Sequence, residues 1–281
     1  VAAETSEQFY NNRLTVGATY LRSADSDQLL AQQSLTESDI NVLKSVGDDL
    51  NAAVTSGIDR SGDTEDINIK YAQIDTTVSG TDYTVFKHLP GNPRSILVVR
   101  FSRVGAGNGD YARISQATNG LVYEWVGPGN GAYSPNRQLP APQQQQMVAI
   151  RSGFSVTDNF QLFGEWAASS LDKNRFSGLD DGDNTDLAYT TGLAVNNVET
   201  GLGAFNAKYT RRFNGNNFEF FDRVRVIEFD RKWNLSGPIT GEETLDEAVV
   251  ELGFLERSEL SLEYGQIKRN SFESRRQGST L

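Results

Sequence analysis

The sequence predicts an all-β protein built from antiparallel hairpins, and three observations predict it. Apolar residues recur with a period of two along most of the chain. Glycine is frequent, with 26 residues, and it marks the ends of the alternating segments. Aromatic residues make up 10% of the chain and favour strands. We therefore expect a single β-rich region over residues 1–281 that forms part of a large β-barrel, with a weak candidate boundary at the proline-rich segment 135–146.

The first predicted elements are a strand and one short helix. The strand is the alternating run of Leu14, Val16, Ala18 and Tyr20. Thr36 and Asp39 form a capping box at the start of a helix near 36–46, and Gly47 follows where a C-terminal glycine belongs. Two further alternating segments follow, at 50–58 and 67–71.

The middle of the chain contains the motif V-G-x-G-N-G-x-Y twice, at 104–111 and 126–133. Gly and Asn adopt positive φ at low cost, and an apolar run precedes each copy. We therefore expect a strand, a tight turn and a strand at each copy, with Tyr111 and Tyr133 in equivalent positions. A phosphate-binding glycine loop would open a helix, and no helical pattern follows either copy.

Three alternating strand pairs are expected in the remainder, at 147–168, 186–213 and 247–267. The first turns at 157–159 and the second at Asn196-Asn197. Between the last two pairs, residues 217–235 carry charges on both faces. We expect a strand here, which either rises above a membrane or forms the solvated edge of a soluble sheet.

Alternating faces suit either a soluble sandwich or a transmembrane barrel, and three details favour the barrel. The strands are about ten residues long, which matches a tilted membrane crossing. Short turns alternate with long acidic loops, and the less apolar faces are rich in small and charged residues. The charged residues expected to face the lumen are Arg151, Glu165, Lys208, Glu251 and Glu263.

Composition argues against several other functions. The net charge is −11 and no basic face is evident, so we expect no nucleic-acid partner. Cysteine is absent, which removes disulfides, thiolate nucleophiles and cysteine metal sites. The one histidine, His88, has no G-x-S-x-G partner motif, and no run of 18 apolar residues predicts a transmembrane helix.

One acidic loop and several carboxylate pairs are the remaining candidates for chemistry. The loop Asp180–Asp186 offers oxygen ligands for Ca²⁺ but lacks the spacing and distal Glu of an EF-hand, so a solvated loop is favoured. Glu242-Glu243 and Glu247 with Glu251 resemble a glycosidase pair only by chance proximity in an acidic chain. We therefore expect no enzymatic activity, no cofactor, and no catalytic or metal-binding residue.

Residues 97–176 carry a family resemblance. The stretches that carry the resemblance are RFSRVGAGNGDY, LVYEWVGPGNGAYSP, LPAP and FGEWAASSLDKNRFS, with VGATYL at 16–21 and SDINVLKSVGDD at 38–49. They resemble very large outer-membrane proteins of the Bacteroidota, Chlorobi and Gemmatimonadota lineages, distantly related to the SprA-like translocon of type IX secretion. The resemblance implies a huge barrel made from one chain, of which this sequence is an internal fragment.

The expected function is that of a non-enzymatic wall segment of an outer-membrane β-barrel at the bacterial cell surface. Its role would be transport, protein translocation or scaffolding. Its partners would be outer-membrane lipid and, as implied by the resemblance, secreted cargo or accessory envelope proteins. The alternative is a secreted soluble β-rich domain that mediates adhesion or binds carbohydrate.

Overall fold

The computed structural model describes residues 1–25, 35–59, 69–117, 120–222, 225–235, 241–254 and 258–281. The chain divides into two compact units. Unit 1 comprises Val1–Leu29 and Pro142–Leu281, and unit 2 comprises Leu30–Ala141.

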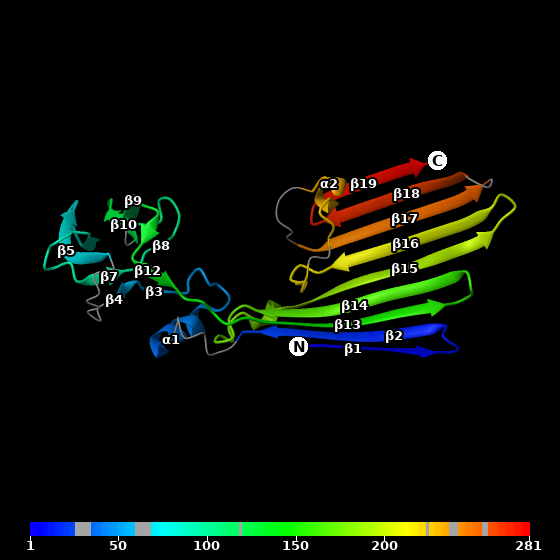
Figure 1. Cartoon of the computed structure of the whole chain (residues 1–281), viewed down its shortest axis with the longest axis horizontal. Coiled ribbons are helices and arrows are strands. Elements are labelled where there is room, and N and C mark those ends of the chain that lie inside the picture. The colour runs from blue at the N-terminus through cyan, green and yellow to red at the C-terminus, as the bar shows by residue number, and fades with distance from the viewer. Residues whose placement is uncertain (26–34, 60–68, 118–119, 223–224, 236–240, 255–257) are drawn as a thin grey trace. The chain divides into compact units, whose positions relative to one another are not determined.

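Unit 1 is built around one nine-stranded antiparallel sheet (Figure 1). Its strands are β1 (Ala2–Phe9), β2 (Leu14–Ala24), β13 (Gln144–Ser155), β14 (Phe160–Asp172), β15 (Thr185–Glu199), β16 (Ala204–Asn214), β17 (Glu243–Phe254), β18 (Ser258–Arg269) and β19 (Phe272–Thr280). Neighbours in the sheet follow chain order as a meander, with unit 2 inserted between the directly paired β2 and β13. The described strands form an open sheet with β1 and β19 as its edges. The predicted all-β class is confirmed, and the three predicted strand pairs all occur.

The two ends of this sheet differ in the length of their connections. The connections at one end are the short segments 10–13, 156–159, 200–203 and 255–257. The opposite end carries the long connections 25–143, 173–184 and 215–242, together with the tight turn 270–271. The short 3-10 helix Asp181–Asp183 lies within the second of these long connections. We call the two ends the short-turn end and the long-connection end.

Strand register assigns the side chains to two faces. One row across the sheet consists of Phe154, Leu162, Leu193, Tyr209, Ala248 and Tyr264. The neighbouring positions in each strand point to the opposite face. They include Val249, which pairs with Lys208 on one side and with Glu263 on the other. The predicted alternation of an apolar and a charged face is therefore confirmed from β13 to β18.

Two predictions for unit 1 were wrong. The turn predicted at Asn196-Asn197 is a bulge: Asn197 adopts φ 49°, the register shifts between Val195 and Val198, and β15 continues to Glu199. The strand predicted within 217–235 is absent from the described residues, and α2 (Phe229–Trp233) forms there instead. Phe229 and Trp233 are four residues apart, so one helix face buries both rings.

Unit 2 contains the predicted helix and several short strands. The helix α1 (Glu37–Val46) has the predicted capping box, in which Asp39 N donates to Thr36 Oγ1 and Thr36 N donates to Asp39 Oδ2. The strands are β3 (Val54–Ser56), β4 (Ile58–Asp59), β5 (Lys70–Val78), β6 (Thr81–Lys87), β7 (Leu97–Val99), β8 (Ser102–Arg103), β9 (Tyr111–Ala117), β10 (Gly120–Trp125), β11 (Tyr133–Ser134) and β12 (Asn136–Gln138). They make a sheet β10-β9-β11-β8, a sheet β4-β7-β5-β6 and the pair β12-β3. The predicted segment 67–71 is described only from residue 69.

The two copies of V-G-x-G-N-G-x-Y in unit 2 interlock. The first copy joins β8 to β9, which both flank β11, and the second joins β10 to β11, which both flank β9. Each copy therefore arches over a strand, and the prediction of two simple turns between adjacent strands was wrong. Tyr111 pairs directly with Tyr133, and Gly109 with Gly131, so the equivalence predicted for the tyrosines is confirmed.

The backbone geometry explains why each of these positions of the motif is a glycine. The first two glycines of both copies adopt positive φ, for example 97° at Gly105 and 104° at Gly127. The third glycine meets the other copy so closely that a Cβ on Gly131 would lie 2.6 Å from the carbonyl carbon of Tyr111. The asparagine amides donate to the carbonyl oxygen four residues earlier, Asn108 to Val104 and Asn130 to Val126. The motif is therefore a backbone clasp.

Candidate functional site

The first candidate surface is the apolar face of the nine-stranded sheet. Eleven large apolar side chains on this face are 36–59% exposed: Val148, Ile150, Phe154, Leu162, Trp166, Leu187, Leu193, Tyr209, Val250, Leu262 and Tyr264. They run without a break from β13 to β18. Large contiguous apolar patches are uncommon on monomeric soluble proteins, and this face is therefore a candidate interaction surface.

A polar cluster borders this apolar face toward the long-connection end of β16 to β19. Arg211 binds both carboxylate oxygens of Asp246, at 2.8 and 3.0 Å, and Tyr209 Oη donates to the same carboxylate at 2.6 Å. On the next strands, Gln266 and Arg275 both donate to Glu273. The apolar face therefore ends at a line of paired charges.

The opposite face, here called the charged face, carries ion pairs between strands, either adjacent or separated by one strand. Arg151 pairs with Glu4, and Arg276 pairs with Glu263. The ammonium of Lys208 lies 5.6 Å from the centre of the Phe163 ring. The five charged residues predicted to share a face do so. Arg151 is directly opposite Glu165, and Lys208 is in register with Glu263 through Val249. Glu251 pairs with Asn206, which lies two residues before Lys208 on the same strand.

The β16–β17 connection covers the long-connection end of the charged face. We call residues 215–222 and 225–235 of this connection the strap. At one side Glu219 N donates to Ser169 Oγ of β14 at 2.9 Å, and Gln145 of β13 donates to the carbonyl of Phe220 at 3.2 Å. At the other side Trp233, 1% exposed, packs with Leu245 of β17 and Ile267 of β18.

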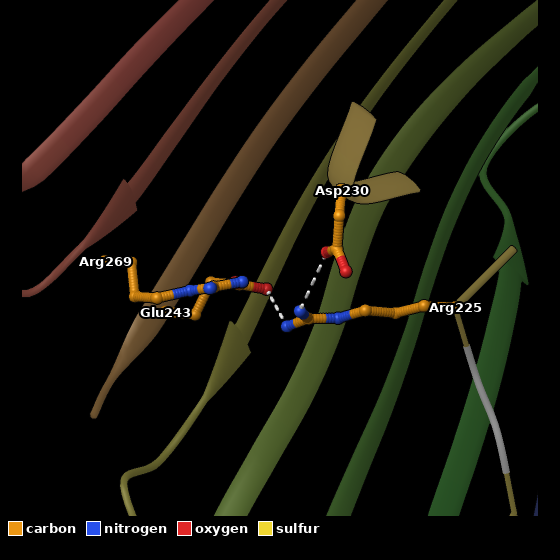
Figure 2. Close-up of polar contacts among 4 residues, drawn as sticks. All are labelled: Arg225, Asp230, Glu243 and Arg269. Atoms are coloured by element: carbon orange, nitrogen blue, oxygen red, sulfur yellow. Dashed lines mark hydrogen bonds and ion pairs between the residues drawn. The ribbon is translucent and has the colours of Figure 1, made fainter. Parts of the chain in front are cut away.

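A buried ion cluster fastens the strap to the sheet (Figure 2). Glu243 at the start of β17 is 2% exposed. Its Oε2 accepts two bonds from Arg269 of β18, at 2.9 and 2.6 Å, and its Oε1 accepts one from Arg225 of the strap at 2.5 Å. Arg225 Nη1 is 4.0 Å from Asp230 and has no hydrogen-bond partner among the described residues. Burial lowers the pKa of the Arg225 guanidinium, while the charge of Glu243 acts in the opposite direction.

Several cavities border the described part of the strap, one of them beside Lys232. One of about 290 Å³ has Phe218, Asp222, Arg225 and Asp230 in its walls, and one of about 260 Å³ lies between Phe220 and the strands that carry Glu165 and Arg212. The larger of these two contains more acidic than basic side chains, so it does not form an anion site in spite of Arg225. Neither of the two brings together a nucleophile and a base.

The residues considered from the sequence as candidates for chemistry make structural contacts. Asp186 accepts hydrogen bonds from the amides of Leu187 and Asn217, at 2.7 and 2.8 Å. Within the described ranges, no three His, Cys, Asp or Glu residues are placed to hold a metal ion. His88 Nδ1 lies 2.9 Å from the Lys70 carbonyl oxygen, against the ring of Tyr71. Glu243 is bound by arginines and does not face Glu242 as a catalytic pair would.

The strap itself was missed by sequence reasoning. Its sequence reads as a charged strand, and neither Arg225 nor Glu243 differs locally from the other charged residues of an acidic chain. The spacing of Phe229 and Trp233 was the one available signal for a helix.

Comparisons with known proteins provide no family for this chain. No family model, no curated protein and no solved structure matches it. In the described part of the chain, no helix has the length and hydropathy needed to cross a membrane.

Proposed function

We propose that the nine-stranded sheet is a section of the wall of a membrane-spanning β-barrel in a bacterial outer membrane. In this proposal the apolar face contacts lipid, and the charged face lines an aqueous interior. The chain performs no chemistry, and its role is transport, protein translocation or scaffolding. The observation that carries the proposal is the division of the sheet into one exposed apolar face and one charged face.

The slope of the apolar band supports the proposal. Counted from the long-connection end, the apolar positions begin at Val148 on β13 and at Tyr264 on β18. Tyr264 is in register with Phe154, which lies six residues beyond Val148 on β13. Over five strand steps this is a shift of about 1.2 residues, or about 4 Å, for each strand spacing of about 4.8 Å. A band held level in a membrane would then require strands tilted by about 40°, within the ~35–45° of transmembrane barrels.

The height of the band also supports the proposal. On β15 the apolar positions extend from Leu187 to Val195, about 26 Å along the strand at ~3.3 Å per residue. With a tilt of about 40° the band is about 20 Å tall, a few ångströms less than the ~25 Å apolar band of outer-membrane barrels. The short turns at one end and long connections at the other follow the asymmetry of periplasmic turns and extracellular loops.

Reconstitution of the full-length protein tests the proposal. After detergent removal we expect it to float with lipid vesicles and to aggregate when lipid is absent. Leu193→Arg, on the apolar face, should lower barrel stability in vesicles by about 2–4 kcal/mol. Thr210→Arg, on the charged face opposite Glu247, is the matched control and should have little effect. Full-length protein that stays monomeric and soluble without detergent would contradict the proposal.

A second candidate is the secreted soluble β-rich domain that mediates adhesion or binds carbohydrate. The polar cluster around Asp246 favours it, because paired charges on a strand face are typical of a solvated surface. Under the barrel proposal the same cluster lies at the level of the lipid headgroups. Equal effects of Leu193→Arg and Thr210→Arg, in a protein that needs no lipid, would favour the soluble domain.

A further inference from the structure

The strap lies along the sheet instead of extending away from its end. Its first part contacts β13, β14 and β15: Gly215 N donates to the Leu187 carbonyl oxygen at 2.9 Å, in addition to the bonds with Gln145 and Ser169. Its second part, which includes α2, packs over β17 and β18. The strap therefore spans the charged face from β13 to β18.

Glycine in the sheet makes room for the strap. Trp233 sits directly over Gly265 of β18, where a Cβ would lie 2.5 Å from the indole Cη2. The indole is almost completely buried, and so are Leu245 and Ile267 beneath it. Trp233 is thus accommodated by the absence of a side chain at Gly265 and by the apolar side chains of Leu245 and Ile267 in an otherwise charged face.

Arg225 acts as a latch between the strap and the sheet. Glu243 and Arg269 both belong to the sheet and remain paired with each other if Arg225 is removed. Loss of Arg225 therefore weakens the attachment of the strap to the sheet without leaving Glu243 as an unpaired buried charge. In Figure 2 the Arg225 side chain extends from the strap toward Glu243, beneath Asp230.

We propose that the strap is a constriction element, which narrows the path along the charged face at the long-connection end and is held there by Arg225. This inference rests on the proposed barrel, because only in a barrel does the charged face line a path. Any solute that passes along this face must then pass the strap, so the strap sets the size limit of passage. Interiors of outer-membrane barrels are narrowed or plugged by loops or helices in the same manner.

Single-channel conductance of the full-length protein in planar lipid bilayers tests the proposal. Arg225→Gln should raise the conductance or the open probability. Arg275→Gln is the matched control, since it removes an exposed arginine from the ion pair with Glu273 on β19 and should leave the conductance unchanged. An unchanged conductance in Arg225→Gln, with the protein inserted, would overturn the constriction while leaving the barrel intact.

A second measurement remains informative if Arg225→Gln does not fold. The chain has no cysteine, so Asp222→Cys labels the strap uniquely, and Leu202→Cys labels a 70% exposed turn at the opposite end. A bulky maleimide on Asp222→Cys should reduce the current, and the same label on Leu202→Cys should not. Complete labelling at Asp222→Cys without a change in current overturns the constriction. Protein that neither inserts nor conducts overturns the proposed barrel, and the inference falls with it.

Discussion

Removal of one hydroxyl from the repeat in unit 2 tests how the clasp is stabilised. Tyr111 is 2% exposed, and its Oη accepts a hydrogen bond from the backbone amide of Phe86 at 2.8 Å. Tyr111→Phe leaves the ring in place but leaves that buried amide without an acceptor. An unsatisfied buried donor costs about 1–3 kcal/mol, so we expect the region around β6 to lose about that much local stability.

Hydrogen exchange of the Phe86 amide is the appropriate assay, because it reports local opening within the full chain. A loss of about 1–3 kcal/mol corresponds to exchange that is ~5–150-fold faster. The effect should be confined to β5, β6 and β9, because Phe86 and Tyr111 belong to the same aromatic core.

The second copy of the motif provides the control. Tyr133 occupies the equivalent position but is only half-buried, and its hydroxyl makes no hydrogen bond within the described residues. Tyr133→Phe should therefore change exchange at Phe86 little. Equal acceleration in both variants, or no acceleration in Tyr111→Phe, would refute the assignment of the acceptor.

Three further predictions follow from buried groups. Gly131→Ala should destabilise unit 2 by about 1–3 kcal/mol, because its Cβ would overlap the backbone of Tyr111 and cannot be accommodated by a side-chain rotation; urea unfolding followed by near-ultraviolet circular dichroism measures it. Burial alone would raise the pKa of Asp39, but hydrogen bonds from Thr36 and the 2.8 Å ion pair with Arg137 lower it. The stability that ionised Asp39 contributes is therefore fully present above the unfolded pKa of about 3.9, and it is lost as the pH falls through the lower folded pKa. The urea midpoints of wild type and Asp39→Asn should therefore differ at neutral pH, and this difference should vanish in acid. Glu243→Gln leaves the buried Arg269 without its counter-charge and Arg225 with only Asp230 at 4.0 Å, and should cost about 3–5 kcal/mol in thermal unfolding; a cost no greater than that of Arg275→Gln would contradict the burial of the cluster.

Much of the fold was predictable because its signals are local. The alternation of Val148, Ile150 and Phe154 placed these residues on one face before any pairing was known. The helix α1 was likewise predictable, since the capping box of Thr36 and Asp39 lies within four residues. The candidate site was predictable only in part: the charged face followed from the alternation, but its strap did not.

The failures involve contacts between residues far apart in the chain. The bulge at Asn197 was predicted as a turn because asparagine at positive φ serves both structures equally well. The region 217–235 was predicted as a strand because burial of Phe229 and Trp233 depends on the floor provided by β17 and β18. Propensity is a weak guide where tertiary packing determines the conformation.

By itself, the sequence determined the β class, the two chemically distinct faces, the helix start and the need for glycine in the repeated motif, because each depends on neighbouring residues and backbone geometry. Only the tertiary structure decided that the two repeats clasp each other, that Tyr111 and Tyr133 differ in their hydrogen bonds, and that Glu243 is a buried partner of Arg225 and Arg269. These depend on which distant segments meet. Burial changes the energy of a charge or a hydroxyl by several kcal/mol without any local trace in the sequence.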